Sequence, residues 1–203
     1  MPTTASRSAG RPRDSNGERT RAVLIEAAIE MFARQGLART TLRDIAEAAN
    51  LSGGTLYHYF NSKADLYRAA YLWAIEDQFT DMRAAIRGKR TVRSRLVAVI
   101  ERNYERSLEK PRVMNFVLRA WVEHNAEDQQ PLPVPDYVGE LHDAIIGDGV
   151  ENGEVSAGGA QRVIDALRCM QWGISALAVT GRSPKEAVEG LKAFVSDPLA
   201  GGL

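Results

Sequence analysis

Residues 40–66 read TTLRDIAEAANLSGGTLYHYFNSKADL, and this stretch decides the fold. Thr41, with Asp44 three residues later, fits a capping box, so a helix of about eight residues is expected here. Asn50 follows, a residue that tolerates the left-handed conformation of a tight turn better than most. Ser52 then caps a second short helix that ends near Phe60. Two short capped helices around a tight turn predict a helix-turn-helix motif.

The interior of this motif is also readable in the sequence. Ala46 is small, which lets the two helices cross closely, and Leu51 and Leu56 are placed to fill the corner beneath them. In such a motif the first helix braces the second, which is narrow enough to enter the major groove of DNA.

Helical periodicity extends in both directions from the motif. Upstream, apolar residues at three-to-four spacing predict a helix over 18–35 that ends at Gly36. Downstream, Ser62 and Asp65 cap a long helix over about 63–87. Ser183, Pro184 and Glu186 predict the capped start of the last helix. The remaining periodic segments are 92–110, 114–127, 137–150, 159–180 and 184–196. No segment alternates with period two for long enough to predict a strand, so the fold class is all-α.

Composition excludes several classes of protein. The chain has 203 residues, 44% of them apolar and 26% charged, with 26 basic and 26 acidic side chains, as in a globular protein rather than a disordered one. No apolar run approaches a membrane span and no secretion signal opens the chain, so we expect a cytoplasmic protein without membrane contact. The single cysteine, Cys169, excludes an intramolecular disulfide and a multi-cysteine zinc site. We expect no metal and no cofactor.

The run from Arg19 to about Leu66 resembles the DNA-binding domain of the TetR (tetracycline-repressor) family of bacterial transcription regulators. The residues that carry the resemblance are Thr41, Ile45-Ala46, Ser52, Thr55-Leu56-Tyr57, Phe60 and Lys63-Ala64-Asp65-Leu66. Two departures are Asn50, where the family more often has Gly, and Gly53-Gly54. The rest of the chain matches in helix order and length.

The resemblance implies three regions. Residues 1–17 form a flexible basic arm, 18–62 a three-helix DNA-binding domain with the helix-turn-helix, and 63–203 a helical ligand-binding and dimerisation domain. Arg7, Arg11 and Arg13 lie in the arm with no acidic residue among the first 13. Such an arm can reach into a minor groove, and a solvated tail without a role is the open alternative.

The resemblance also assigns DNA contacts. Phosphate contacts are expected from Thr41, Ser52, Thr55, Tyr59 and Lys63, and base contacts from Arg43, Tyr57 and His58. Gly53 and Gly54 leave backbone amides open to a phosphate, and Arg11 and Arg13 extend the surface through the arm. Alternatives stay open for single residues. Tyr57 and, more strongly, Phe60 also fit a core, His58 also fits a plain surface position, and Lys63 also fits a helix start.

The second region suggests a dimer and a ligand pocket. The apolar faces of 159–180 and 184–196 exceed what a monomer buries, so they are expected to pair with a second copy as a four-helix bundle. Such a dimer sets its two reading helices about 34 Å apart, which predicts a near-palindromic operator. Pocket candidates, each of which also fits an ordinary core, are Tyr104, Met114, Phe116, Trp121, His124, Met170 and Trp172.

The function expected from these features is that of a homodimeric repressor, released from double-stranded operator DNA by a small apolar or aromatic ligand. A transcriptional activator of the same fold fits equally well. An enzyme with Cys169 as nucleophile and His124 or His142 as base is disfavoured, because a thiol inside an apolar helix is expected to be buried and inert. An interaction module without DNA binding is the third alternative, which the basic arm and Lys63 disfavour.

Overall fold

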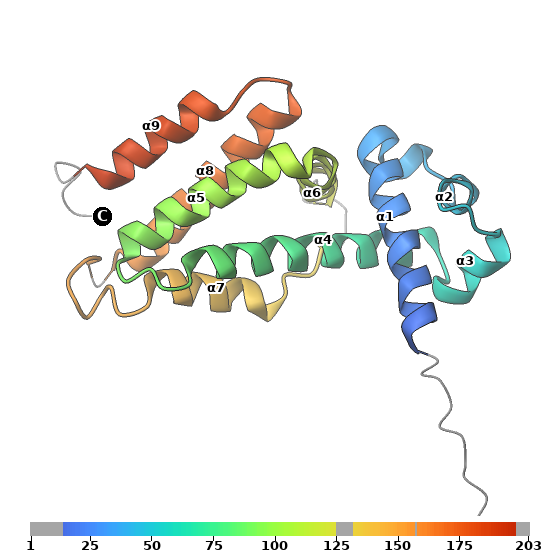
Figure 1. Ribbon diagram of the computed structural model, residues 1–203, viewed down its shortest axis with the longest axis horizontal. Helices are drawn as coiled ribbons and strands as arrows, with labels where there is room; N and C mark the ends of the chain where they lie inside the picture. Colours follow the sequence, from blue (N-terminus) through green and yellow to red (C-terminus); the bar gives the residue numbers. More distant parts are fainter. Residues whose placement is uncertain (1–13, 125–131, 157, 198–203) are drawn as a thin grey trace, which may run out of the picture.

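The structure, a computed structural model, describes residues 14–124, 132–156 and 158–197. Within these ranges it consists of nine α-helices without a strand, which confirms the all-α class (Figure 1). The helices are α1 (Asp14–Arg39), α2 (Leu42–Ala48), α3 (Gly53–Tyr59), α4 (Lys63–Ile86), α5 (Val92–Glu109), α6 (Pro111–His124), α7 (Asp136–Ile146), α8 (Ala160–Val179) and α9 (Lys185–Ser196). No helix in the described ranges has the length and apolar character of a membrane span.

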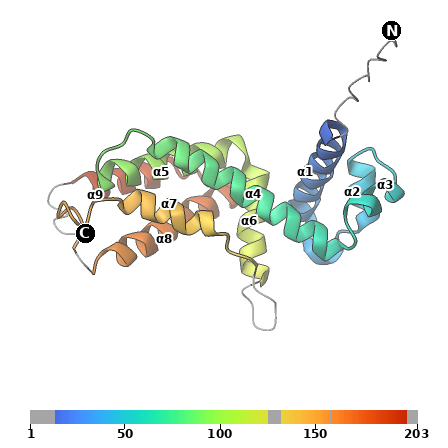
Figure 2. The ribbon, with the colours of Figure 1, turned by 90° about the horizontal axis from the view of Figure 1, so that it is seen from below.

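The molecule is elongated, with α1, α2 and α3 at one end and α5, α7, α8 and α9 at the other (Figures 1 and 2). Helix α4 runs between the two ends, and α6 lies across the middle, beside both α1 and α8. The expected boundary between residues 62 and 63 coincides with the start of α4.

The caps predicted for α2 and α3 are formed. Thr41 Oγ1 accepts a hydrogen bond from the Asp44 N–H at 3.1 Å, and the Thr41 N–H donates to the Asp44 carboxylate at 2.9 Å. Ser52 Oγ accepts from the Thr55 N–H at 3.0 Å. Asn50 has a φ of 53°, the left-handed conformation expected of it. These local bonds satisfy orphan N–H groups and fix where α2 and α3 begin.

Three helix starts differ from expectation. Helix α1 begins at Asp14, four residues early, and it continues to Arg39 across a break at Gly36, whose φ is 79°. Helix α6 begins at Pro111 rather than 114, because proline is well suited to the first helical turn. The predicted cap of α9 is wrong. Pro184 occupies the N-cap position without a side-chain hydrogen bond, and Ser183 Oγ only accepts from the Lys185 N–H at 3.4 Å.

Two buried clusters form the core. The first surrounds α1 and contains Leu24, Phe32, Ala46, Leu56 and Phe60, so the corner beneath α2 and α3 is filled as predicted. It also takes in residues of α4 and α6, among them Tyr67, Tyr71, Phe116 and Ala120. The helix-turn-helix end of the molecule therefore shares its core with two helices of the second region. The other cluster joins α5 to α7, α8 and α9.

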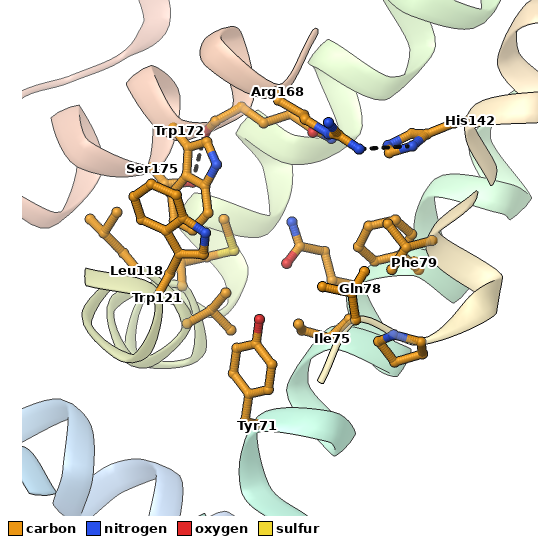
Figure 3. A pocket seen from close by; sticks show the side chains of 16 residues that line it. Tyr71, Ile75, Gln78, Phe79, Leu118, Trp121, His142, Arg168, Trp172 and Ser175 are labelled. Carbon is orange, nitrogen blue, oxygen red and sulfur yellow. Dashed lines mark hydrogen bonds between the residues drawn. The ribbon is translucent and has the colours of Figure 1, made fainter. Parts of the chain in front are cut away.

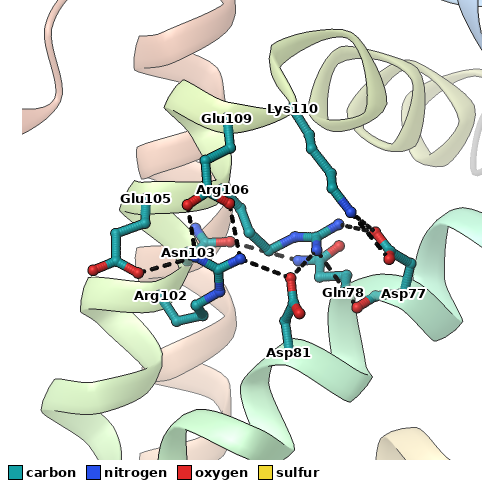
Figure 4. A network of polar contacts seen from close by, with 9 residues as sticks. All are labelled: Asp77, Gln78, Asp81, Arg102, Asn103, Glu105, Arg106, Glu109 and Lys110. Atoms are coloured by element: carbon teal, nitrogen blue, oxygen red, sulfur yellow. Dashed lines mark hydrogen bonds and ion pairs between the residues drawn. The ribbon is translucent and has the colours of Figure 1, made fainter.

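An ionic cluster, Asp77, Asp81, Arg102, Glu105, Arg106, Glu109 and Lys110, fixes α4 to α5 (Figure 4). Arg106 is fully buried, and its guanidinium pairs with the carboxylates of Asp77, at 2.9 Å, and Asp81. Sequence reasoning missed this cluster. Its signal is two acids spaced i,i+4 on one helix and two arginines spaced i,i+4 on the next.

Candidate functional site

One surface of the molecule combines the exposed sides of α2 and α3. Arg43 and Tyr57 line the same shallow groove between these helices, together with Glu47 and Gly53. The Arg43 side chain is 87% exposed and Tyr57 is 61% exposed. Ser52, Gly54 and His58 are also exposed. We call this surface, defined by Thr41, Arg43, Ser52, Gly53, Gly54, Thr55, Tyr57 and His58, the reading face.

Arg43 is held by a neighbour on its own helix. Its Nε donates to Glu47 Oε1 at 2.8 Å across one helical turn. An exposed i,i+4 pair of this kind contributes little to stability, because solvent screens it. The contact therefore orients the guanidinium over the groove and yields easily to a stronger acceptor.

The hydroxyls of the reading face differ in the donor capacity that they retain. Thr41 Oγ1 accepts from the Asp44 N–H, and the Thr41 hydroxyl also hydrogen-bonds the Asp44 carboxylate. Ser52 Oγ and Thr55 Oγ1 lie 2.9 Å apart and share one proton, so one of the two remains free to donate. Hydrogen bonds from the Thr41 hydroxyl and its N–H hold the pKa of Asp44 below its usual range. The capping carboxylate is therefore ionised at neutral pH.

Two residues assigned to DNA by resemblance have a structural role as well. Lys63 Nζ donates to the carbonyl oxygens of Leu37 at 2.8 Å and Thr40 at 3.0 Å, so it caps the C-terminal end of α1. An ammonium has three donors, and one is left for a phosphate. Tyr59 is half-buried, with its ring in edge contact with His58. Sequence reasoning did not foresee the capping role of Lys63.

Phe60 is 2% exposed and belongs to the core, with the Arg21 guanidinium over its ring. The core alternative weighed for it is therefore confirmed. Tyr57, for which a core position was also open, lies on the surface. Arg7, Arg11 and Arg13 lie outside the described residues.

A second site is a cavity of about 400 Å³ enclosed by α4, α6, α7 and α8 (Figure 3). Of the pocket residues expected from sequence, Met114, Trp121 and Trp172 line it. The two indoles contact each other, with ring centroids 4.6 Å apart.

The other expected pocket residues do not line this cavity. His124 stacks on Tyr67 with ring centroids 5.0 Å apart, because α6 turns this side chain toward α4 near the reading end. Tyr104 and Met170 pack against the second core cluster. Phe116 is fully buried in the first cluster. Each had the open alternative of a core residue, and periodicity alone does not distinguish the two faces of a helix buried on both sides.

Sequence reasoning missed most of the polar lining, namely Tyr71, Gln78, His142, Arg168, Gln171 and Ser175. The signal available was Arg168, with Trp172 and Ser175 following on the same face of the helix. Arg168 Nη1 pairs with Asp165 at 3.1 Å, and Nη2 lies 3.5 Å from His142 Nδ1. Burial, and then the charge of Arg168, lower the pKa of His142. The imidazole is therefore neutral at neutral pH.

The outer side of α8 and α9 is a third surface. Cys169, Gly173 and Ala176 are exposed along α8, and Phe194 on α9 is 58% exposed. The expectation that Cys169 is buried is wrong, because the buried side of α8 is the one that carries Val163, Leu167 and Ile174. Toward the C-terminal half of α8 the exposed residues Cys169, Gly173 and Ala176 are small, which allows another helix to approach closely.

The fold and the reading face together define a class of protein. A short capped helix that braces a second, solvent-exposed short helix is the arrangement of helix-turn-helix DNA-binding proteins. Residues 24–70 match the family model described as bacterial regulatory proteins, tetR family. Residues 24–70 therefore have the sequence character of the DNA-binding domain of this family.

Individual proteins agree with this family. Over 90 residues the chain is 36% identical to the HTH-type transcriptional repressor KstR2 of Rhodococcus jostii, a match that covers 44% of this chain and 43% of that protein. The chain thus spans less than half the length of this relative. The crystal structure of a TetR family transcription regulator from Marinobacter aquaeolei has a TM-score of 0.71 at 17% identity and covers 89% of this chain and 95% of that one. The regulator FadR from Bacillus subtilis, solved in complex with stearoyl-CoA, has a TM-score of 0.62 at 22% identity, covering 90% and 98%.

Proposed function

We propose that the protein is a homodimeric transcriptional repressor that binds a near-palindromic operator in the cytoplasm and is released by a small molecule bound in the cavity. The observation that carries this proposal is the reading face, where Arg43 and Tyr57 project from one groove on a braced helix pair. An exposed arginine beside an exposed aromatic on a recognition helix is suited to reading base edges.

The roles on DNA follow from the donors available. Thr41, Ser52 and Thr55 place hydroxyls on the reading face, and one hydroxyl of the Ser52–Thr55 pair has a free proton for a phosphate. Such contacts would position the domain without selecting a sequence. Gly53 leaves open space around its Cα, so the DNA backbone can approach the amides there. Arg43 is the candidate for guanine. Tyr59, Lys63, Arg11 and Arg13 would add contacts at the edges of the reading face.

Dimerisation is supported by the outer side of α8 and α9. Cys169, Gly173 and Ala176 form a surface of small residues along α8, and Phe194 supplies an apolar side chain to bury. Two copies related by a twofold axis would cover both helices in a four-helix bundle. Such a dimer presents two reading faces to one side of a duplex.

The position of α6 supports control by a ligand. Its residues Phe116 and Ala120 pack in the core of the reading end, whereas Met114 and Trp121 line the cavity. Helix α6 is also tied to α1 by an ion pair between Arg112 and Glu30. A molecule in the cavity that favours one position of α6 would therefore shift the placement of the reading face. The FadR neighbour shows that a protein of this fold accommodates a ligand.

The remaining alternatives differ in support. An activator uses the same surfaces and stays open. An enzyme is disfavoured because Cys169 lies on the outer side of α8, whereas His142 lines the cavity on the other and His124 stacks on Tyr67. An interaction module without DNA binding leaves the exposed Arg43 and Tyr57 unexplained.

The test is fluorescence anisotropy of the full chain with labelled duplex from upstream of its own gene. Arg43→Ala and Tyr57→Ala are each expected to weaken binding by about tenfold or more, the effect of one lost base contact. Arg90→Ala, which changes another exposed arginine, at the far end of the molecule, is the matched control and should leave binding unchanged. Indifference to both reading-face changes would refute the proposed surface.

A further inference from the structure

The lining of the cavity has one sign of charge. Within the described part of the chain, Arg168 is the only permanently charged side chain that lines it, and no carboxylate does so. Arg168 uses two of its five N–H donors, toward Asp165 and His142. Asp165 stands outside the cavity, and it pairs with Arg168 in a half-exposed setting where such pairs are weak. The cavity therefore offers a cation and free donors to an anionic group.

The opposite end of the cavity holds a second unused donor. Tyr71 is 5% exposed, and its hydroxyl has no hydrogen-bond partner among the described residues. Figure 3 shows this hydroxyl pointing into the cavity, across from Arg168 and His142. Burial, followed by the influence of Tyr137, raises the pKa of Tyr71 to about 12, so the hydroxyl keeps its proton. The Tyr71 hydroxyl opens onto the cavity, so it can donate a hydrogen bond to a molecule bound there.

The walls between these two ends carry three aromatic side chains among aliphatic ones. The Trp121 and Trp172 rings lie on one side of the cavity, and Phe79 lies on the other (Figure 3). Aromatic rings gain from offset or edge contacts with another ring system, beyond the area they bury. The walls therefore favour a flat body over a flexible chain.

We propose that the cavity binds a planar, aromatic or ring-fused carboxylate, whose acid group pairs with Arg168, whose ring system lies against Trp172, and which accepts a hydrogen bond from Tyr71. This inference rests on the proposed function, because it names the chemical class of the ligand that would release the operator. The cavity volume of about 400 Å³ falls within the range of pockets that hold small organic ligands.

The test is isothermal titration calorimetry with four matched probes and the full chain. Naphthalene-2-carboxylate represents the proposed class, naphthalene-2-carboxamide removes the charge, and 2-naphthylmethylammonium reverses it. Undecanoate keeps the carboxylate and the number of carbon atoms but replaces the rings with a chain. We expect the naphthoate to bind at least about tenfold more tightly than each of the others, as a charge-assisted bidentate contact allows. Equal affinity for the amide or the ammonium would overturn the anionic class, and equal affinity for undecanoate would overturn the planar one.

Variants separate the two polar contacts. Arg168→Gln should bring the ratio of naphthoate to amide affinity to about one, because only the charged probe uses the guanidinium. Arg162→Gln, on the same helix and outside the cavity, is the control and should preserve the ratio. Tyr71→Phe should weaken both probes by a similar factor, about fivefold, and leave the ratio intact. A ratio that survives Arg168→Gln would contradict the assignment of the acid group.

The inference and the proposed function fail in different ways. DNA binding by the unliganded protein, measured in the same preparation, does not depend on the cavity. Operator binding without naphthoate binding would overturn the ligand class and leave the regulator intact. Naphthoate binding without any duplex binding would overturn the proposed role as a regulator, and the proposed ligand class would stand.

Discussion

The two long sides of α4 meet opposite kinds of surroundings. Toward α5, Asp77 and Asp81 engage a fully buried Arg106 in the ionic cluster (Figure 4). Toward α6, α7 and α8, Tyr71 and Gln78 face a hollow (Figure 3). A buried charge held by two partners fixes a helix, since any shift of the helix would leave the charge in an apolar environment without its ion-pair partners. A cavity, in contrast, allows its lining side chains to move and a ligand to bind. We therefore infer that the side of α4 facing α5 anchors the helix, whereas the side facing the cavity can respond to a ligand.

The largest expected effect breaks the anchored side. Arg106→Met removes the buried cation and leaves two partly buried carboxylates with fewer partners, so the free energy of unfolding should fall by about 3 kcal/mol. Arg168→Met, at the hollow, should change it by less than about 0.5 kcal/mol, because its ion pair is half-exposed. Urea denaturation of both variants measures the difference. Equal losses would mean that the two sides do not differ as described.

A second pair of changes compares the available space. Leu167 is 1% exposed in the second core cluster, so Leu167→Phe should destabilise the protein by about 1–3 kcal/mol through overpacking. Leu118 lines the cavity, and Leu118→Phe should cost less than about 1 kcal/mol because the ring enters open space. Thermal and urea unfolding test this pair. A larger loss for Leu118→Phe would show that the hollow is already filled in solution.

The ionic cluster also predicts a dependence on acid. Burial opposes ionisation of Asp77 and Asp81. Asp77 accepts hydrogen bonds from Lys110 and Arg106, and Asp81 accepts them from Arg102 and Arg106. These bonds outweigh the effect of burial and hold both pKa values below the usual range. Groups with a depressed pKa in the folded state stabilise it above their unfolded pKa, and this stability is lost as the pH falls through the folded pKa. The unfolding free energy should therefore drop as the pH is lowered from 5 to well below 4.

The control for this acid dependence is the Arg106→Met variant, in which both carboxylates lose their buried partner. Its unfolding free energy should fall less steeply over the same pH range. Urea titrations at a series of pH values give the two slopes. Parallel curves for the variant and the parent chain would exclude the cluster as the source of the acid sensitivity.

The smallest expected effect compares two tyrosines of α4. The Tyr67 hydroxyl donates to Glu123 at 3.3 Å, so Tyr67→Phe should cost about 1 kcal/mol. The Tyr71 hydroxyl faces the hollow without a partner, so Tyr71→Phe should be neutral within about 0.5 kcal/mol or slightly stabilising. Denaturation midpoints resolve this difference. A clear loss for Tyr71→Phe would indicate a hydrogen bond that the cavity itself supplies.

The reading end was far more predictable than the rest of the chain. Thr41, Asp44, Asn50 and Ser52 act through bonds within three or four residues, so their structural consequences are encoded locally. The exposure of Tyr57 did not follow from periodicity, because a helix as short as α3 has too few turns to define one face.

The cavity depends on contacts between helices far apart in the sequence. Tyr71, Trp121 and Arg168 meet only when α4, α6 and α8 pack together, and no local pattern orients them. His124 shows the same limit, since it shares a helix with Trp121 but faces the other core. Helix order and approximate lengths were therefore predictable, whereas the side that each cavity helix presents was not.

The central claim is that the reading face selects DNA sequence twice per dimer. The most direct measurement is selection of tight-binding duplexes from a random library by the full chain, repeated with Arg43→Ala and Tyr57→Ala. The account predicts enrichment of an inverted repeat with half-sites one helical turn apart, about 34 Å, and loss of defined bases in both half-sites with each variant. Enrichment of no sequence, or of the same sequence by all three proteins, would contradict it.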